Sequence, residues 1–122
     1  MKLTTKQISK LGNLRHFKMP YKRTYTKLLA SSKRKKQKCD ISYDDFINFT
    51  KIKLCHYCFK PIKWVAHGKK VTAYYLDRKD NSIGYTKDNC VVYCTRCNLT
   101  KSDKYDYEEW FGMTEYFRRM YD

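Results

Sequence analysis

The sequence contains no long hydrophobic run. No stretch approaches the ~20 apolar residues that a membrane-spanning helix needs, and the first eight residues lack the apolar segment of a signal peptide. These absences predict a cytoplasmic protein that does not enter a membrane, in a compartment where thiols stay reduced. In such a compartment, cysteines in regular motifs indicate metal binding rather than disulfides.

Acidic residues are absent from the first 38 positions, where every charged side chain is Lys or Arg. The whole chain of 122 residues has a formal net charge of +15, although residues 101–122 hold more acids than bases. A positive field attracts polyanions, which favours a nucleic acid over a membrane surface as the partner. The densest basic run should contact phosphates, and it comprises Lys33, Arg34, Lys35 and Lys36.

Six cysteines are present, and four of them form two CxxC pairs. The pairs are Cys55 with Cys58 and Cys94 with Cys97. Each CxxC turn directs two sulfurs to one point, so the two pairs predict a structural site for one tetrahedral Zn²⁺. A domain of this size has a limited apolar core, and a metal crosslink would add folding energy. Cys90 lies in an apolar run and should be a small buried side chain. The surroundings of Cys39 in the sequence indicate no particular role for it.

The pattern of residues predicts short elements. Pro20 prevents one continuous helix through the basic segment. Ser42 followed by Asp45 is typical of a helix start, and Asp106 should cap a helix in the tail. Residues 71–76 are rich in β-branched and aromatic types, which favour a strand. In chain order the expected elements are a helix around 24–30, a helix from 43, a strand at 71–76, a polar loop at 81–89, a strand at 90–93, a helix opening at Asn98 and a helix after Asp106.

The stretch from 76 to 101 carries an ordered set of motifs. It begins Leu76-Asp77-Arg78-Lys79-Asp80-Asn81, continues with Gly84-Tyr85-Thr86-Lys87-Asp88-Asn89 and ends Cys94-Thr95-Arg96-Cys97-Asn98-Leu99-Thr100-Lys101. Together with the first CxxC pair, this order resembles the HNH endonucleases. It is similar to the small phage-type members of that family, whose zinc is held by two CxxC pairs. The resemblance covers residues 52–103, which is under half of the chain.

The resemblance implies a small α+β protein with a ββα-metal core. Two antiparallel strands and a helix would surround one divalent ion, braced by zinc and flanked by N- and C-terminal helices. We therefore expect a basic DNA-binding extension at 1–40 and a nuclease domain at 41–122. The implied activity is metal-dependent hydrolysis of phosphodiester bonds, which nicks or cuts double-stranded DNA.

The family also implies roles for single residues. Its catalytic ion, Mg²⁺ or Mn²⁺, would be bound by Asp77 and Asn98, whose oxygens suit such ions. The middle Asn of the family name matches Asn89, which ties the loop together and holds the catalytic residue in position. The basic side chains around the motif that could grip phosphates are Lys79, Lys87, Arg96 and Lys101.

One position departs from the family pattern. The family's general base is a His directly after the first metal ligand, and this chain has Arg78 there. A guanidinium cannot take the proton from water, but it can bind a phosphate through two hydrogen bonds. The candidates for the base are then Tyr75, on the same strand face as Asp77, His67 just upstream, bulk water and a metal-bound hydroxide.

Two other interpretations are open, and Arg78 in the place of the family's His favours the first. A degenerate HNH module could bind DNA or RNA without cutting it, although the retained Asp77 and Asn98 favour an enzyme. A zinc-ribbon protein that scaffolds a larger ribonucleoprotein or virion would fit the charge. That role would leave the Asp–Asn pair unexplained.

Overall fold

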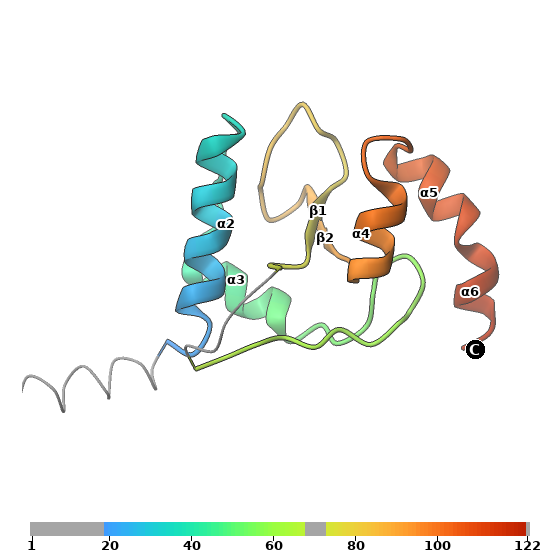
Figure 1. Ribbon diagram of the computed structural model, residues 1–122, viewed down its shortest axis with the longest axis horizontal. Coiled ribbons are helices and arrows are strands. Elements are labelled where there is room, and N and C mark those ends of the chain that lie inside the picture. The colour runs from blue at the N-terminus through green and yellow to red at the C-terminus, as the bar shows by residue number, and fades with distance from the viewer. Residues whose placement is uncertain (1–18, 68–72, 122) are drawn as a thin grey trace, which may run out of the picture.

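The computed structural model describes residues 19–67 and 73–121 (Figure 1). Seven elements follow one another in this part of the chain: α2 (Lys22–Arg34), α3 (Tyr43–Thr50), β1 (Leu76–Arg78), β2 (Cys90–Val92), α4 (Thr95–Lys101), α5 (Tyr107–Met113) and α6 (Glu115–Arg119). The protein is a small mixed α/β structure with a two-stranded sheet. None of the helices in the described ranges has the length and apolarity that crossing a membrane would require.

The sheet is a short antiparallel ribbon formed by β1 and β2. Its register pairs Leu76 with Val92 and Arg78 with Cys90. The strand expected at 90–93 is confirmed as β2, but the strand expected at 71–76 is wrong. Residues 71–72 lie outside the described ranges, and the strand begins only at Leu76 because Tyr75 has a positive φ of 54°. That conformation is rare for a bulky residue and interrupts extended backbone.

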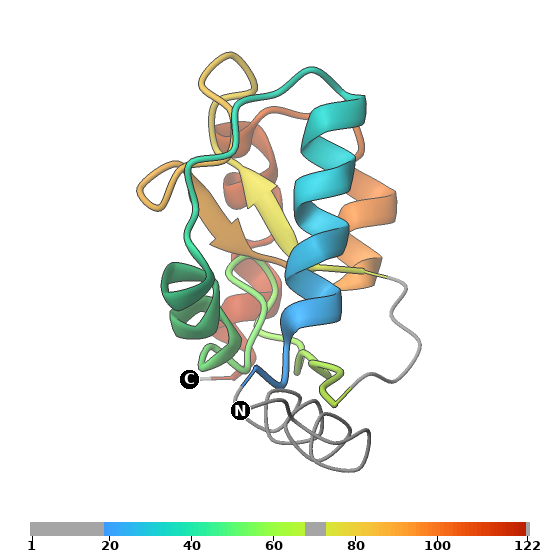
Figure 2. The same cartoon turned by 90° about the vertical axis from the view of Figure 1, so that its left-hand side faces the viewer.

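The two strands lie between α2 on one side and α4 with α5 and α6 on the other (Figures 1 and 2). A single core cluster joins these layers, and it includes Leu28 of α2, Phe46 of α3, Leu76 of β1 and Trp110 of α5. Leu28 is fully buried. The division expected at residue 40 therefore does not separate the core, because α2 packs as part of it. Residues 1–18 of the expected extension lie outside the described ranges.

The expected helix caps are confirmed at two places. Ser42 accepts a hydrogen bond from the Asp45 amide at 3.1 Å, and the Asp45 carboxylate accepts one from the Ser42 amide at 3.3 Å. Asp106 and Glu109 form the same reciprocal pair at the start of α5. Each cap satisfies amides that the first helical turn would leave unpaired, a contribution of about 1 kcal/mol.

Helix α4 begins earlier than the sequence indicates. It was expected to open at Asn98, but it starts at Thr95 with Cys94 as its N-cap, whose sulfur accepts from the Cys97 amide at 3.4 Å. A sulfur thus performs the capping that an oxygen usually performs. Asn98 consequently lies one turn inside the helix and not at its end.

The loop between the strands is fastened to the segment that follows α2. The Tyr85 amide donates to the Lys38 carbonyl at 2.7 Å, and the Asp40 amide donates to the Tyr85 carbonyl at 2.7 Å. Gly84 makes this approach possible, since it has a φ of +91° and an added Cβ would lie 2.7 Å from the Lys38 oxygen. The basic segment and the strand loop are therefore held together by backbone hydrogen bonds.

Candidate functional site

Four cysteines from two distant segments meet in one buried cluster. Their sulfurs all lie within 4.8 Å of one another, with 3.7 Å between Cys55 and Cys97 and 3.6 Å between Cys58 and Cys94. Zn–S bonds of about 2.3 Å in a tetrahedron place the sulfurs about 3.8 Å apart. The arrangement fits a zinc ion. Cys39 and Cys90 are outside the cluster, and burial raises the pKa of Cys90 to about 12.

The thiols of the cluster hold their protons unequally, because each one is hydrogen-bonded to another. Hydrogen bonds from Cys55 and then Cys97 lower the pKa of Cys94, while the hydrogen bond to Cys94 raises the pKa of Cys55 to about 11. The indole N–H of Trp110 is the buried side-chain polar atom of the described residues without a hydrogen-bond partner. It faces Cys97, whose pKa is raised first by Cys55 and Cys94 and is lowered by Trp110. This N–H is thus ready to donate to a zinc-bound thiolate.

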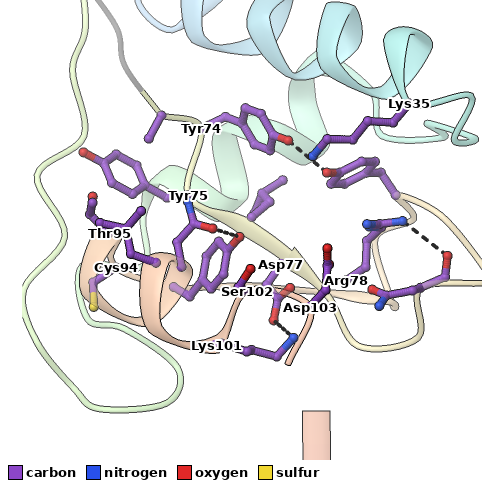
Figure 3. Close-up of a pocket in the computed structure, with 17 residues that line it drawn as sticks. Lys35, Tyr74, Tyr75, Asp77, Arg78, Cys94, Thr95, Lys101, Ser102 and Asp103 are labelled. Carbon is purple, nitrogen blue, oxygen red and sulfur yellow. Dashed lines mark hydrogen bonds and ion pairs between the residues drawn. The ribbon is translucent and has the colours of Figure 1, made fainter. Parts of the chain in front are cut away.

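A cavity of about 330 Å³ opens beside the cysteine cluster (Figure 3). Its wall is built from β1 and the residues just before it, two residues of the loop between the strands, the residues that directly follow β2, helix α4 and Lys35, which directly follows α2. Three of the four residues predicted to be catalytic, Asp77, Arg78 and Asn98, line it. Residues separated by twenty positions in the sequence are brought together here because α4 packs beside the strands.

Asp77 is held at the floor of the cavity by two contacts to one oxygen. The Tyr57 hydroxyl donates to Oδ2 at 2.5 Å, and the Lys101 ammonium lies 3.4 Å from the same atom. The side chains of Asp77 and Lys101 are 11% and 5% exposed, so this ion pair is largely shielded from water. Burial, followed by the charge of Asp77, raises the pKa of Tyr57, which keeps its phenol a donor.

Lys101 differs from its expected role. Lys101 was expected to contact DNA phosphates, but its side chain is buried and pairs with Asp77. Because the last turn of a short helix normally faces water, the sequence pattern did not indicate this burial. Lys79 and Arg96 are exposed but do not line the cavity, and they lie over the rings of Tyr107 and Phe117.

Asn98, from α4, lines the same cavity as Asp77. Its Oδ1 accepts a hydrogen bond from the Tyr93 hydroxyl at 2.8 Å, and the side chain is exposed to the cavity. In the described ranges, the cysteine cluster is the one group of three or more His, Cys, Asp or Glu residues placed to hold a metal. Asp77 is not part of such a group.

Arg78 is directed along the cavity rim. Its Nη1 donates to the Asn81 carbonyl at 3.2 Å, and its guanidinium lies 5.2 Å from the centre of the Tyr85 ring. Of the two side chains predicted as a base, Tyr75 lines the cavity and His67 does not. The His67 amide instead donates to the carbonyl of Pro20 at 2.8 Å.

Asn89 closes the loop between the strands. Its Nδ2 donates to the carbonyls of Asp80 at 2.9 Å and Gly84 at 2.7 Å, and its Oδ1 accepts from the Asp80 amide at 3.0 Å. The side chain is buried and does not line the cavity. These contacts tie the loop together, which is the part that the sequence analysis expects Asn89 to play.

Sequence reasoning missed the aromatic hydroxyls of the site. Tyr57 contacts Asp77, Tyr93 contacts Asn98, and Tyr74 shares a hydrogen bond of 2.9 Å with Tyr85. The position of Tyr57 inside the first CxxC pair was the available signal, because a residue there must lie beside the metal turn. Nothing in the sequence distinguishes Tyr93 or Tyr74 from the other tyrosines.

Comparisons with known proteins add a phage relative. No family model matches the chain, and no solved structure matches it. The chain is similar to an uncharacterized 29.0 kDa protein in the dda-modA intergenic region of Enterobacteria phage T4, with 30% identity over 109 residues. The match covers 89% of this chain and 38% of the relative, so the chain spans well under half of that protein. The relative is a phage protein, which fits a phage origin for this chain.

Proposed function

We propose that this protein is a metal-dependent DNA endonuclease of the HNH type that nicks or cuts double-stranded DNA. The observation that carries the proposal is the meeting of Asp77 and Asn98 in one cavity, from β1 and α4, beside the cysteine cluster. A carboxylate and an amide oxygen facing a common space suit Mg²⁺ or Mn²⁺. Such an ion, when bound, polarises a phosphate and stabilises the leaving oxygen.

The protein's own side chains would prepare this site. Tyr57 and Lys101 both engage Oδ2 of Asp77, which fixes the carboxylate in the wall of the cavity. Tyr93 fixes the amide of Asn98 in the same way. Because these partners are present before any ligand arrives, little reorganisation is needed when substrate binds.

Arg78 would bind the phosphate that is cut. The ring of Tyr85 and the carbonyl of Asn81 hold its guanidinium at the rim, where its other N–H groups can donate to two phosphate oxygens. Tyr75 is the titratable candidate that remains at the cavity for accepting the proton of the attacking water, with bulk water as the alternative. His67 lies outside the cavity lining and is the weaker candidate.

A non-catalytic DNA-binding module is the second candidate. The buried ion pair between Asp77 and Lys101 favours it, since that pair satisfies the carboxylate without any ion. Arg78 in the place of the family's His also favours the non-catalytic module.

Plasmid nicking distinguishes the two candidates. The zinc-loaded protein is incubated with supercoiled plasmid and Mg²⁺ or Mn²⁺ at low salt and at several pH values. Asp77→Asn is the inactive comparison, and Asp88→Asn is its matched control because Asp88 is an exposed acid of the loop between β1 and β2 and does not line the cavity. Nicking by wild type and Asp88→Asn but not by Asp77→Asn supports the enzyme. DNA binding without nicking under either metal establishes the module.

A further inference from the structure

The last turn of α2 is directed at the candidate active site. Lys35, the residue that follows α2, lines the same cavity as Asp77, and Figure 3 shows it reaching toward the hydroxyl of Tyr74. The neighbouring basic side chains Lys33, Arg34 and Lys36 do not line this cavity. The basic run is therefore not uniform, because one of its four members belongs to the site.

Packing holds this end of α2 in place. Leu28 and Ser31 are buried against the core, at 0% and 5% exposure. The Ser31 hydroxyl shares a hydrogen bond of 3.1 Å with the Tyr74 hydroxyl, which in turn shares one of 2.9 Å with the Tyr85 hydroxyl. Both tyrosines line the cavity, so the helix is connected to the cavity wall.

The chain turns away immediately after Lys35. Lys36 adopts a left-handed conformation with φ of 56°, and the Gln37 amide donates back to the Ser32 carbonyl at 2.8 Å. This is the bonding of a helix-terminating turn. Lys38 is then fastened to Tyr85 through its carbonyl. The backbone of Lys35 is thus fixed on both sides before any ligand binds.

The charge at this wall suits a phosphodiester. Lys35 and Arg78 both line the cavity, and the Arg78 guanidinium lies over the ring of Tyr85. The acids of the lining are Asp77, which is already paired with Lys101, and Asp103. Within residues 19–67 and 73–121, Lys35 takes part in no ion pair. Its ammonium is therefore available to an anionic ligand.

We propose that Lys35 binds the DNA backbone phosphate next to the one that Arg78 contacts, so that α2 sets the position of the strand in the cavity. The proposal rests on the proposed function, in which the cavity receives a DNA backbone. It assigns a substrate-binding role to one lysine of the basic run and a diffuse electrostatic role to the other three.

Binding without cleavage tests this assignment. The affinity of a short labelled duplex is measured by anisotropy over a range of salt concentrations, with no divalent cation added. Lys35→Ala should weaken binding about tenfold, the loss of one charge-assisted contact, and should reduce the salt slope by about 1. Lys33→Ala removes the same charge from an exposed position of the same helix and should change the affinity by less than about twofold. Lys35→Arg should retain most of the affinity.

Equal losses at Lys35 and Lys33, or no loss at Lys35, would overturn the proposal. Zinc content and thermal unfolding of Lys35→Ala should match those of the wild type, because the side chain is exposed. In the nicking assay, Lys35→Ala should raise KM with little change in kcat, and a loss confined to kcat would count against it. A wild-type protein that cuts nothing would refute the proposed nuclease. The anisotropy comparison would still decide whether Lys35 binds the backbone.

Discussion

The hydroxyl of Tyr57 donates a hydrogen bond to Oδ2 of Asp77, and the two oxygens lie 2.5 Å apart. Tyr57 stands between two cysteines of the cluster, and its carbonyl accepts a hydrogen bond from Arg118 of α6 at 2.7 Å. The turn that would hold zinc therefore also orients the carboxylate at the floor of the cavity. Structural metal and candidate active site are connected through one side chain.

Tyr57→Phe keeps the ring and removes only this hydrogen bond. We expect the variant to fold and to retain zinc, and to lose about 10- to 100-fold in activity or in affinity for the catalytic ion. Nicking rates over a Mn²⁺ titration measure both quantities. Tyr107→Phe, which removes a hydroxyl bonded to His56 instead, is the control and should stay near wild type. Wild-type rates for Tyr57→Phe would show that Asp77 needs no such support.

Lys101→Met leaves the Asp77 carboxylate without its cation in a site shielded from water. We expect a loss of about 3 kcal/mol in the free energy of unfolding, because breaking one side of a buried pair strands the other charge. Adding Asp77→Asn should recover part of that loss, and the double-mutant cycle gives the coupling. Urea unfolding of the zinc-loaded proteins measures each value. Lys104→Met, at an exposed position, should stay within about 0.5 kcal/mol; a similar loss there would contradict the argument.

Arg78 is tested by two substitutions. Arg78→Ala should abolish nicking with fold and zinc content intact, since the guanidinium contacts the rim and not the core. Arg78→His places the family's usual base at its usual position. It should preserve or raise nicking near neutral pH and add a loss of activity on the acid side near the histidine pKa, which a pH–rate profile would reveal. If Arg78→His is as inactive as Arg78→Ala, phosphate binding by the guanidinium is indispensable.

The cysteine cluster should hold one zinc that the fold requires. Cys94→Ser should lose both the metal and cooperative unfolding, because binding energy at a structural zinc is folding energy. Metal analysis and circular dichroism measure the two effects. Cys39→Ser is the matched control, as Cys39 lies outside the cluster. A well-folded, zinc-free Cys94→Ser would refute a structural role.

The same cluster predicts how zinc affinity depends on pH. The hydrogen bond to Cys94 raises the pKa of Cys55 to about 11, so zinc binding near neutral pH should displace a proton from this thiol. Affinity should therefore rise with pH throughout the range below about 11 and fall steadily toward acid. Competition with a chromogenic chelator at several pH values follows this slope. A pH-independent affinity would mean that the thiols are already ionised.

Several features could be predicted from the sequence because they depend on interactions between residues that are close together in the chain. The two CxxC pairs predicted the cluster because each turn holds its own sulfurs close together, whatever the rest of the chain does. Ser42 with Asp45, and Asp106 as a cap, predicted helix starts because a cap bonds within three residues. The strand at 90–92 was predicted because an apolar β-branched run between polar segments favours burial.

Tertiary packing alone decided the rest. The positive φ of Tyr75 delayed β1. Lys101 became the partner of Asp77, and Lys35 became part of the cavity. Side chains that are far apart in sequence carry no local signal of their contact. Their contact depends on how the core packs the helices around the strands. That packing decides whether a basic side chain faces a carboxylate, a phosphate or water.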